Sequence, residues 1–222
     1  MIRALLFDFN GVLVDDEPIH LELLQRVLGE EGVRLSEEDY YGRYLGLDDR
    51  ACFAAVLGAA GEKATASRLA RLVARKASYY RERMLAGGYP VFPGAAELVG
   101  AAAARGWLLG IVSGALRQLG LARHFKVLVT AEDVADGKPD PEGYRLALEA
   151  LNARPPLPER MVHPHEVLAL EDSLAGIRAA AEAGLLTLGV AHTYGAGDLR
   201  GAHAVVPALA GLTPERLEAL FA

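Results

Sequence analysis

The stretch Leu5–His20 reads LLFDFNGVLVDDEPIH and decides the fold. Four apolar residues, Ala4–Phe7, lead into the carboxylate of Asp8, and Asn10 follows two positions later. Because side chains alternate along a strand, Asp8 and Asn10 are expected on one face, with Phe9 on the other. In open α/β folds, ligands bind in the crevice at the carboxyl ends of parallel strands. The stretch therefore predicts a buried strand that ends at a polar site.

Further apolar runs along the chain resemble this first strand. They are Leu108–Val112, Val127–Val129, Val167–Leu170, Thr187–Val190 and Ala204–Val206. Helical patterns lie between them, notably at Ala95–Arg105, Pro141–Leu151 and Ala175–Ala183. Strands and helices in alternation are typical of βαβ crossovers, so we expect an α/β fold with a Rossmann-like parallel sheet. A proline-rich stretch, Arg154–His165, is expected to be a long loop.

One segment interrupts this alternation. From Pro18 to about Tyr89 the patterning is helical throughout. The expected helices are Ile19–Gly29, Glu37–Tyr44, Arg50–Leu57 and Glu62–Leu85. The simplest organisation is an all-helical domain over residues 18–90, inserted into a core domain of residues 1–17 and 91–222.

Composition limits the partners that the chain is expected to have. Of 222 residues, 52% are hydrophobic, which suits a globular domain, and the formal net charge is −6. This acidic balance, without Lys/Arg clusters, argues against nucleic-acid binding. No apolar stretch reaches the length of a membrane span, and a single cysteine, Cys52, excludes an internal disulfide. We therefore expect a cytoplasmic protein without membrane partners, either a monomer or a weak homodimer.

Acidic, amide, hydroxyl and basic residues at or beyond the predicted strand ends, in the order Asp8, Asn10, Ser113, Lys138 and Glu171-Asp172, resemble the signatures of an enzyme family that acts on phosphate esters, and phosphoryl transfer explains these residue types. Phosphate monoesters carry about two negative charges near neutral pH, so a carboxylate nucleophile needs cations nearby to approach one. Asp8 with Glu171 and Asp172 would form a hard oxygen site for Mg²⁺, and Lys138 adds a fixed positive charge. The expected binding groups for the phosphoryl oxygens are the Ser113 hydroxyl, the backbone N–H groups of Gly114 and of the Asn10–Gly11 turn, and Lys138.

This order of residues resembles the signatures of the haloacid dehalogenase (HAD) superfamily, in its branch with phosphosugar phosphatases and β-phosphoglucomutase. The resemblance runs from Phe7 to about Val206, and in that family a helical cap follows the first signature. It implies that Asp8 is a nucleophile that forms an aspartyl-phosphate. It also implies that the Asn10 main-chain carbonyl joins the metal ligands, and that the substrate is a small phosphorylated metabolite.

The sequence departs from the family pattern at one catalytic position. The usual form is Asp-x-Asp-Gly, in which the second acid protonates the leaving oxygen and later activates water, whereas this chain has the amide of Asn10. Three explanations are open. Asn10 is an engineered substitution that traps a substrate or intermediate; or it is native, with Asp15, Asp16 or the substrate supplying the proton; or the protein has become a binder.

Residues of the cap are expected to select the substrate. Arg50 follows the loop that begins at Gly46 and is placed where related caps present a cation to substrate, which suits a second phosphate or a sugar carboxylate. Lys76, on the long cap helix, is a second candidate, and His20 is expected at the edge of the site.

Three function classes are compatible with these residues. A Mg²⁺-dependent phosphatase that acts on a small phosphorylated metabolite, such as a phosphosugar, is the expected activity. A phosphosugar mutase would use the same site, and a phosphometabolite-binding module would keep the fold without turnover. A dehalogenase is disfavoured, because attack at carbon does not require this set of cations.

Overall fold

The structure is a computed structural model that describes residues 1–45, 47–87, 90–112, 122–130 and 132–222. It divides into two compact units. The core unit comprises Met1–Asp15 and Tyr89–Ala222, and the cap unit comprises Asp16–Gly88. Each unit is described by itself below.

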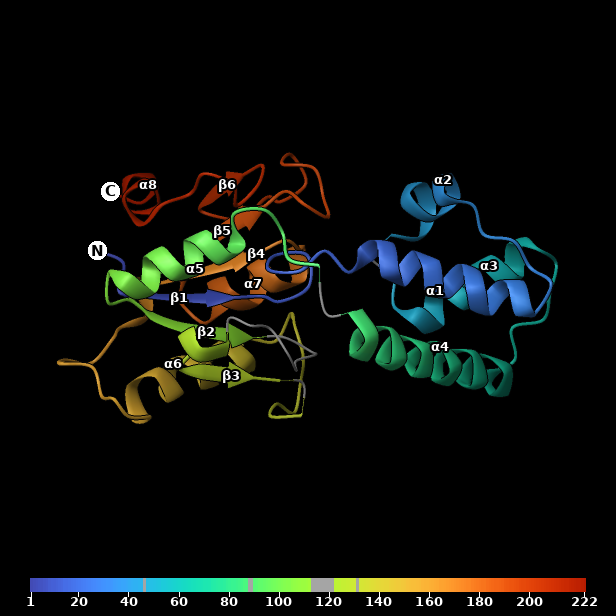
Figure 1. Ribbon diagram of the computed structural model, residues 1–222, viewed down its shortest axis with the longest axis horizontal. Helices are drawn as coiled ribbons and strands as arrows, with labels where there is room; N and C mark the ends of the chain where they lie inside the picture. The colour runs from blue at the N-terminus through green and yellow to red at the C-terminus, as the bar shows by residue number, and fades with distance from the viewer. Residues whose placement is uncertain (46, 88–89, 113–121, 131) are drawn as a thin grey trace. The chain divides into compact units, whose positions relative to one another are not determined.

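The core unit is built on a six-stranded sheet (Figure 1). Its strands are β1 (Ala4–Phe7), β2 (Leu108–Val112), β3 (Val127–Val129), β4 (Val167–Glu171), β5 (Leu186–Val190) and β6 (Ala204–Val206). They lie in the order β3-β2-β1-β4-β5-β6, and every pairing is parallel. The expected Rossmann-like α/β fold is thereby confirmed.

Helices cover both faces of this sheet. They are needed on both faces because successive apolar side chains of β1 point to opposite sides of the sheet. Leu5 and Phe7 point into a core shared with α5 (Ala95–Ala104) and α8 (Pro214–Leu220). Ala4 and Leu6 point into the opposite core. That second core is shared with α6 (Glu142–Ala153) and α7 (Leu174–Glu182). All four residues of β1 are completely buried, so this strand is the hydrophobic centre of the unit.

The position of β1 brings Asp8 to the middle of the sheet edge. β1 pairs with β2 on one side and with β4 on the other, in a register that sets Phe7 opposite Leu170. The Asp8 amide then donates to the Leu170 carbonyl at 3.0 Å, which continues the ladder by one bond. Phe9 is fully buried in the core, whereas Asn10 lines the same cavity as Asp8.

The cap unit is helical throughout its described residues, which confirms the all-helical insert (Figure 1). Its elements are α1 (Glu17–Glu30), α2 (Glu37–Asp39), a π-helical turn (Tyr40–Tyr44), α3 (Asp49–Ala59) and α4 (Ala66–Gly87). Side-chain caps at Ser36 and Asp48 start α2 and α3. The apolar faces of α1, α3 and α4 bury Val27, Phe53 and Leu72 in a core of their own.

The structure differs from the sequence-based expectation at three places. The expected helix Glu37–Tyr44 is a three-residue α-helix, α2, followed by the π-helical turn. α4 begins at Ala66 rather than at Glu62, because Gly61 adopts a φ of 76° and the Thr65 hydroxyl accepts from the Arg68 amide, as a helix cap does. Helix α8 (Pro214–Leu220), which the sequence did not predict, is only seven residues long and is capped by Thr213. Nowhere in the described part of the chain is a helix both long and apolar enough to traverse a bilayer.

Gly94, which precedes α5, offers a test of this packing. Its φ is 88°, and a Cβ placed there would lie 2.5 Å from the Ala210 Cα, so Gly94→Ala meets both backbone strain and a clash. We expect Gly94→Ala to lower the free energy of unfolding by at least about 1–2 kcal/mol, measured by urea denaturation. The matched control is Gly100→Ala, inside α5, where a Cβ meets nothing within 4 Å. It should raise stability by about 0.5–1 kcal/mol. Equal effects at the two positions would contradict this description.

Candidate active site

Three carboxylates gather at the carboxyl ends of β1 and β4. Asp8 follows β1, Glu171 is the last residue of β4 and Asp172 comes next. Because the two strands are neighbours in a parallel sheet, their ends meet, and one oxygen from each acid lies within 4.8 Å of the others. All three side chains are buried. Buried like charges at this separation repel strongly unless a cation or a proton intervenes.

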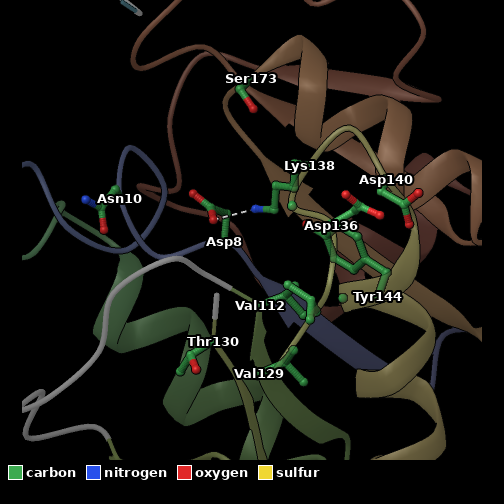
Figure 2. A pocket seen from close by; sticks show the side chains of 13 residues that line it. Asp8, Asn10, Val112, Val129, Thr130, Asp136, Lys138, Asp140, Tyr144 and Ser173 are labelled. Atoms are coloured by element: carbon green, nitrogen blue, oxygen red, sulfur yellow. Dashed lines mark hydrogen bonds and ion pairs between the residues drawn. The ribbon is translucent and has the colours of Figure 1, made fainter. Parts of the chain in front are cut away.

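Lys138 supplies one such cation. It lies on the loop between β3 and α6, and its Nζ is 2.6 Å from Asp8 Oδ1 and 2.6 Å from Glu171 Oε1. Figure 2 shows the amine directed at the Asp8 carboxylate. Burial alone would lower the pKa of Lys138, but the charges of Asp8 and Glu171 outweigh it and raise that pKa above its ordinary value. The amine therefore stays charged.

One lysine does not neutralise three acids. The raised pKa values of Asp8 and Asp172 show that part of the negative charge in the cluster is not compensated. Burial raises the pKa of Asp8 to about 6; Lys138 opposes this rise and Glu171 adds to it. Burial also raises the pKa of Asp172 to about 7, and the charges of Asp8 and Glu171 contribute further. Near neutral pH the cluster thus favours an additional positive charge. Carboxylate oxygens are ligands suited to hard divalent cations, so the donor set fits such an ion.

Glu171 is held by side chains that the sequence analysis missed. Tyr144, completely buried on α6, donates its hydroxyl to Glu171 Oε1 at 2.5 Å. Ser173, the N-cap of α7, donates to Oε2 at 3.2 Å. A Cβ at Gly176 would lie 2.0 Å from that same oxygen, so only glycine leaves room for the carboxylate. Tyr144 has the spacing of a core residue on an amphipathic helix. This spacing gives no indication that its hydroxyl contacts Glu171.

Asp172 is joined to the Asn10–Gly11 turn through the loop after β5. The Thr193 hydroxyl donates to Asp172 Oδ2. A Cβ at Gly11, whose φ is 75°, would lie 2.0 Å from that oxygen, so the turn requires glycine. The adjacent His192 donates from Nδ1 to the Gly11 carbonyl at 2.9 Å. Thr193 was also missed; it lies three positions after the predicted strand Thr187–Val190, not directly after it.

Asn10 shares a cavity of about 370 Å³ with Asp8, Lys138, Tyr144 and Ser173. Figure 2 shows the Asn10 amide on the other side of Asp8 from Lys138. The structure thus brings together six residues predicted for the site, namely Asp8, Asn10, Gly11, Lys138, Glu171 and Asp172. Three further predicted residues, Ser113, Gly114 and Gly46, lie outside the described residues. The Lys138–Pro139 peptide bond is cis.

Within the cap unit, Lys76 and His20 belong to one partly buried polar network. Lys76 is 1% exposed; its Nζ lies 2.6 Å from His20 Nδ1 and forms an ion pair with Asp49. His20 Nε2 lies 3.1 Å from Asp16 Oδ2, which also accepts from the Tyr80 hydroxyl at 2.8 Å.

Arg50, in the first turn of α3, is exposed. Contact of Arg50, Lys76 or His20 with substrate stays a prediction.

Comparison with known proteins assigns the chain to a family. Residues 2–184 match the family described as haloacid dehalogenase-like hydrolase. The chain belongs to the haloacid dehalogenase-like hydrolases. It is 30% identical over 205 residues to a phosphorylated carbohydrates phosphatase of Thermotoga maritima, covering 88% of each chain. It is 32% identical over 210 residues to a phosphoglycolate phosphatase of Rhodospirillum rubrum, covering 87% of this chain and 81% of that relative.

A solved structure agrees with this assignment. The crystal structure of CbbY from Rhodobacter sphaeroides in complex with phosphate matches with a TM-score of 0.76 and 27% identity, over 98% of this chain and 100% of that chain. The resemblance to the HAD superfamily is confirmed. Since curated relatives are named phosphatases, the expected enzyme class, a phosphoric monoester hydrolase, is confirmed as well. The family generally uses a divalent metal, and the buried carboxylate cluster of this HAD-like hydrolase suits one.

Tyr144→Phe tests the support of Glu171. Removing the hydroxyl leaves a completely buried carboxylate with one donor fewer, which typically costs about 1–3 kcal/mol of the free energy of unfolding. Urea denaturation of the whole chain measures this loss. The matched control is Tyr79→Phe, because the Tyr79 hydroxyl also donates to a glutamate, Glu30, but at an exposed site. The urea concentration at which half of the Tyr79→Phe protein is unfolded should stay close to that of the parent protein. Equal losses of unfolding free energy in the two variants would show that the buried hydrogen bond to Glu171 stabilises the fold no more than the exposed one to Glu30.

Proposed function

We propose that this HAD-like hydrolase is a Mg²⁺-dependent phosphatase that releases phosphate from a small phosphorylated metabolite, a phosphosugar, through an aspartyl-phosphate on Asp8. One observation carries the proposal. Asp8 lies in a buried cluster of three carboxylates, 2.6 Å from a lysine that also pairs with Glu171. A nucleophile, a fixed cation and a donor set for a hard metal therefore meet in one place. The names of the curated relatives support phosphorylated carbohydrates as the substrate class.

The proposed ligands of Mg²⁺ are the carboxylates of Asp8, Glu171 and Asp172, together with the main-chain carbonyl of Asn10. Bound Mg²⁺ would supply positive charge that offsets the charges of the acids and of the phosphoryl oxygens. Tyr144 would hold Glu171 in place through its hydroxyl, which donates to Oε1, the oxygen that Lys138 also contacts. Glu171 would then keep its orientation whether or not its other contacts change during the reaction.

The chain's own groups account for the first half of the reaction. One oxygen of the Asp8 carboxylate, Oδ2, attacks phosphorus, while Lys138, bonded to Oδ1, neutralises negative charge beside it. The bond from phosphorus to the leaving oxygen breaks, and the leaving group departs as the anion RO⁻, which then takes a proton from water. Water then attacks phosphorus, which releases inorganic phosphate and restores the Asp8 carboxylate. Ser113 and Gly114, with the Asn10–Gly11 turn, are the proposed holders of the transferred group.

In this proposal Asn10 occupies the position of the usual acid and base, and its amide can perform neither role. General acid–base catalysis typically contributes about 10²–10⁴-fold. Phosphate monoester hydrolysis tolerates that loss, because enzymatic accelerations of such reactions approach about 10²¹-fold. Arg50, Lys76, His20 and the loop at Gly46 are proposed to select the rest of the substrate. The proposed partners are small metabolites only, without nucleic acid or membrane, for a cytoplasmic monomer or weak homodimer.

Phosphate release from 4-nitrophenyl phosphate with excess Mg²⁺ tests the activity directly. Asp8→Asn keeps the size of the side chain and removes the nucleophile, so the rate should fall by at least about 10³-fold. Glu149→Gln, an exposed acid on α6, serves as the control and should retain full activity. Phosphate release that survives Asp8→Asn would contradict the proposal.

The raised pKa values predict how cation binding depends on pH. An acid whose pKa is higher in the folded chain favours folding at low pH and loses this advantage as the pH rises through the folded value. Divalent cations bind only the ionised carboxylates, so they restore stability above these values. With pKa values of about 6 for Asp8 and about 7 for Asp172, Mg²⁺ affinity should fall about 20-fold between pH 8 and pH 6.

Thermal denaturation with and without MgCl₂ at the two pH values measures this change. The stabilisation by Mg²⁺ should be clear at pH 8 and small at pH 6. A stabilisation that is equal at both values, or larger at pH 6, would show that these carboxylates are not the ligands.

A further inference from the structure

Asn10 in the catalytic cavity restricts which phosphates the enzyme can hydrolyse well. Resting on the proposed function, we propose that the substrates are phosphates whose leaving group departs as a stable anion without a proton from the protein. This class comprises acyl phosphates and aryl or enol phosphates. Among phosphosugars it favours a phosphate on the anomeric carbon, whose hydroxyl is more acidic, over a phosphate on a primary alcohol.

The chemical reason is the acidity of the group that leaves. An ordinary alcohol is about as weak an acid as water, whose pKa is about 16, so its alkoxide leaves slowly unless it is protonated. A phenol has a pKa of about 10 and a carboxylic acid of about 4, so these groups leave as anions with much less assistance. A carboxylic acid at position 10 would protonate the leaving oxygen, so poor and good leaving groups would then depart at more similar rates. The carboxamide of Asn10 holds no transferable proton near neutral pH.

Lys138 and Tyr144, the protonatable cavity residues nearest the carboxylates, are engaged with them. Lys138 Nζ lies 2.6 Å from both Asp8 and Glu171, so its charge is directed at the nucleophile rather than at the leaving oxygen. The Tyr144 hydroxyl donates to Glu171 at 2.5 Å, on the fully buried side of that carboxylate. Figure 2 shows both groups on the other side of Asp8 from Asn10.

Asp136 and Asp140 also line the cavity, but they lie in the wrong direction. Figure 2 shows both carboxylates beyond Lys138, on the opposite side of Asp8 from Asn10. Asp140 additionally accepts from the Glu142 amide at 2.9 Å, at the start of α6. These acids are therefore poor substitutes for an acid at position 10.

Of the two acids that follow the first strand, Asp16 is engaged in another network, and Asp15 is tested by a variant. Asp16 Oδ2 accepts from the Tyr80 hydroxyl and lies 3.1 Å from His20 Nε2, so it belongs to the polar network of the cap unit. The negative charge of Asp15 opposes the lowering of the His192 pKa by burial. His192 in turn donates to the Gly11 carbonyl. Asp15 is the more accessible of the two acids, and it therefore has a control variant of its own in the test.

The reaction balances without a protein proton in its first step. The Asp8 carboxylate and the substrate R–O–PO₃²⁻ give the aspartyl-phosphate and the anion RO⁻, so three negative charges are present before and after. Water then cleaves the aspartyl-phosphate to the carboxylate and H₂PO₄⁻, and both protons of the water remain on the phosphate. Because Asn10 cannot activate this water, the second step should limit turnover for substrates with good leaving groups.

The test measures kcat/KM for ring-substituted phenyl phosphates, which differ mainly in the pKa of the leaving phenol, and for glucose 1-phosphate and glucose 6-phosphate. The parent protein is compared with Asn10→Asp and with Asp15→Asn. For the parent, kcat/KM should fall steeply as the leaving-group pKa rises. Asn10→Asp should flatten this dependence and raise kcat/KM for the sugar phosphates by about 10²–10⁴-fold, with little gain for 4-nitrophenyl phosphate. Asp15→Asn should leave the slope as it is in the parent.

The outcomes separate this inference from the proposed function. Equal slopes for the parent and Asn10→Asp overturn the inference alone, provided that phosphate release still depends on Asp8. A steeper slope in Asp15→Asn also overturns it, because Asp15 would then be the acid. Absence of phosphate release from every substrate in both forms overturns the proposed function and the inference with it. Mass spectrometry of the enzyme during turnover gives a second readout, in which aspartyl-phosphate accumulates in the parent more than in Asn10→Asp.

Discussion

Repulsion among three buried carboxylates is the constraint on which the rest of the site depends. Asp8, Glu171 and Asp172 are brought together by strand pairing, because β1 and β4 are parallel neighbours and end side by side. Lys138, Tyr144 and Thr193 each satisfy one or more of these acids. Even so, burial keeps the pKa values of Asp8 and Asp172 well above their ordinary range. The site is thus arranged for a cation and an anionic ligand together.

The sequence predicted the parts of this arrangement that follow from strand ends. The apolar runs gave all six strands, and polar residues directly after them gave Asp8, Glu171 and Asp172. That these acids meet follows from parallel pairing, which is a general property of such sheets. Lys138 lies farther from its strand, and its assignment rested on the resemblance to the HAD superfamily. The helical insert was equally clear, since its patterning continues without a strand from Pro18 onward.

Side chains that support the acids could not be predicted in the same way. Tyr144 lies on the buried face of α6, where hydrophobic periodicity reads it as core, and only tertiary contact shows that its hydroxyl reaches Glu171. His192 contacts Gly11 across 181 positions of sequence, a pairing that no local pattern encodes. Lys76 was considered for substrate contact, and its burial against Asp49 and His20 depends on how three cap helices pack. Thr193 lies three positions after the predicted strand Thr187–Val190, so a rule limited to residues directly after a strand does not find it.

Asn10 stands where the family pattern has an acid. This difference affects proton transfer separately from the other tasks proposed for the site. In the proposed mechanism, this chain retains the residues for charge neutralisation, nucleophilic attack and metal binding, but it lacks the acid that would transfer a proton to the leaving oxygen. The fold is unaffected, because the glycine after Asn10 still gives Asp172 its space. Under the proposed mechanism, the residue at this position would select among substrates by the acidity of their leaving groups.

The central claim is that the carboxylates of Asp8 and Asp172 share one divalent ion. Anomalous X-ray scattering from crystals of the full chain grown with Mn²⁺, which binds to oxygen sites of the Mg²⁺ type, tests this most directly. The account predicts a single strong peak about 2.1 Å from carboxylate oxygens of both residues. A peak elsewhere, with Asp8 bonded only to Lys138 and Asp172 only to Thr193, would contradict it.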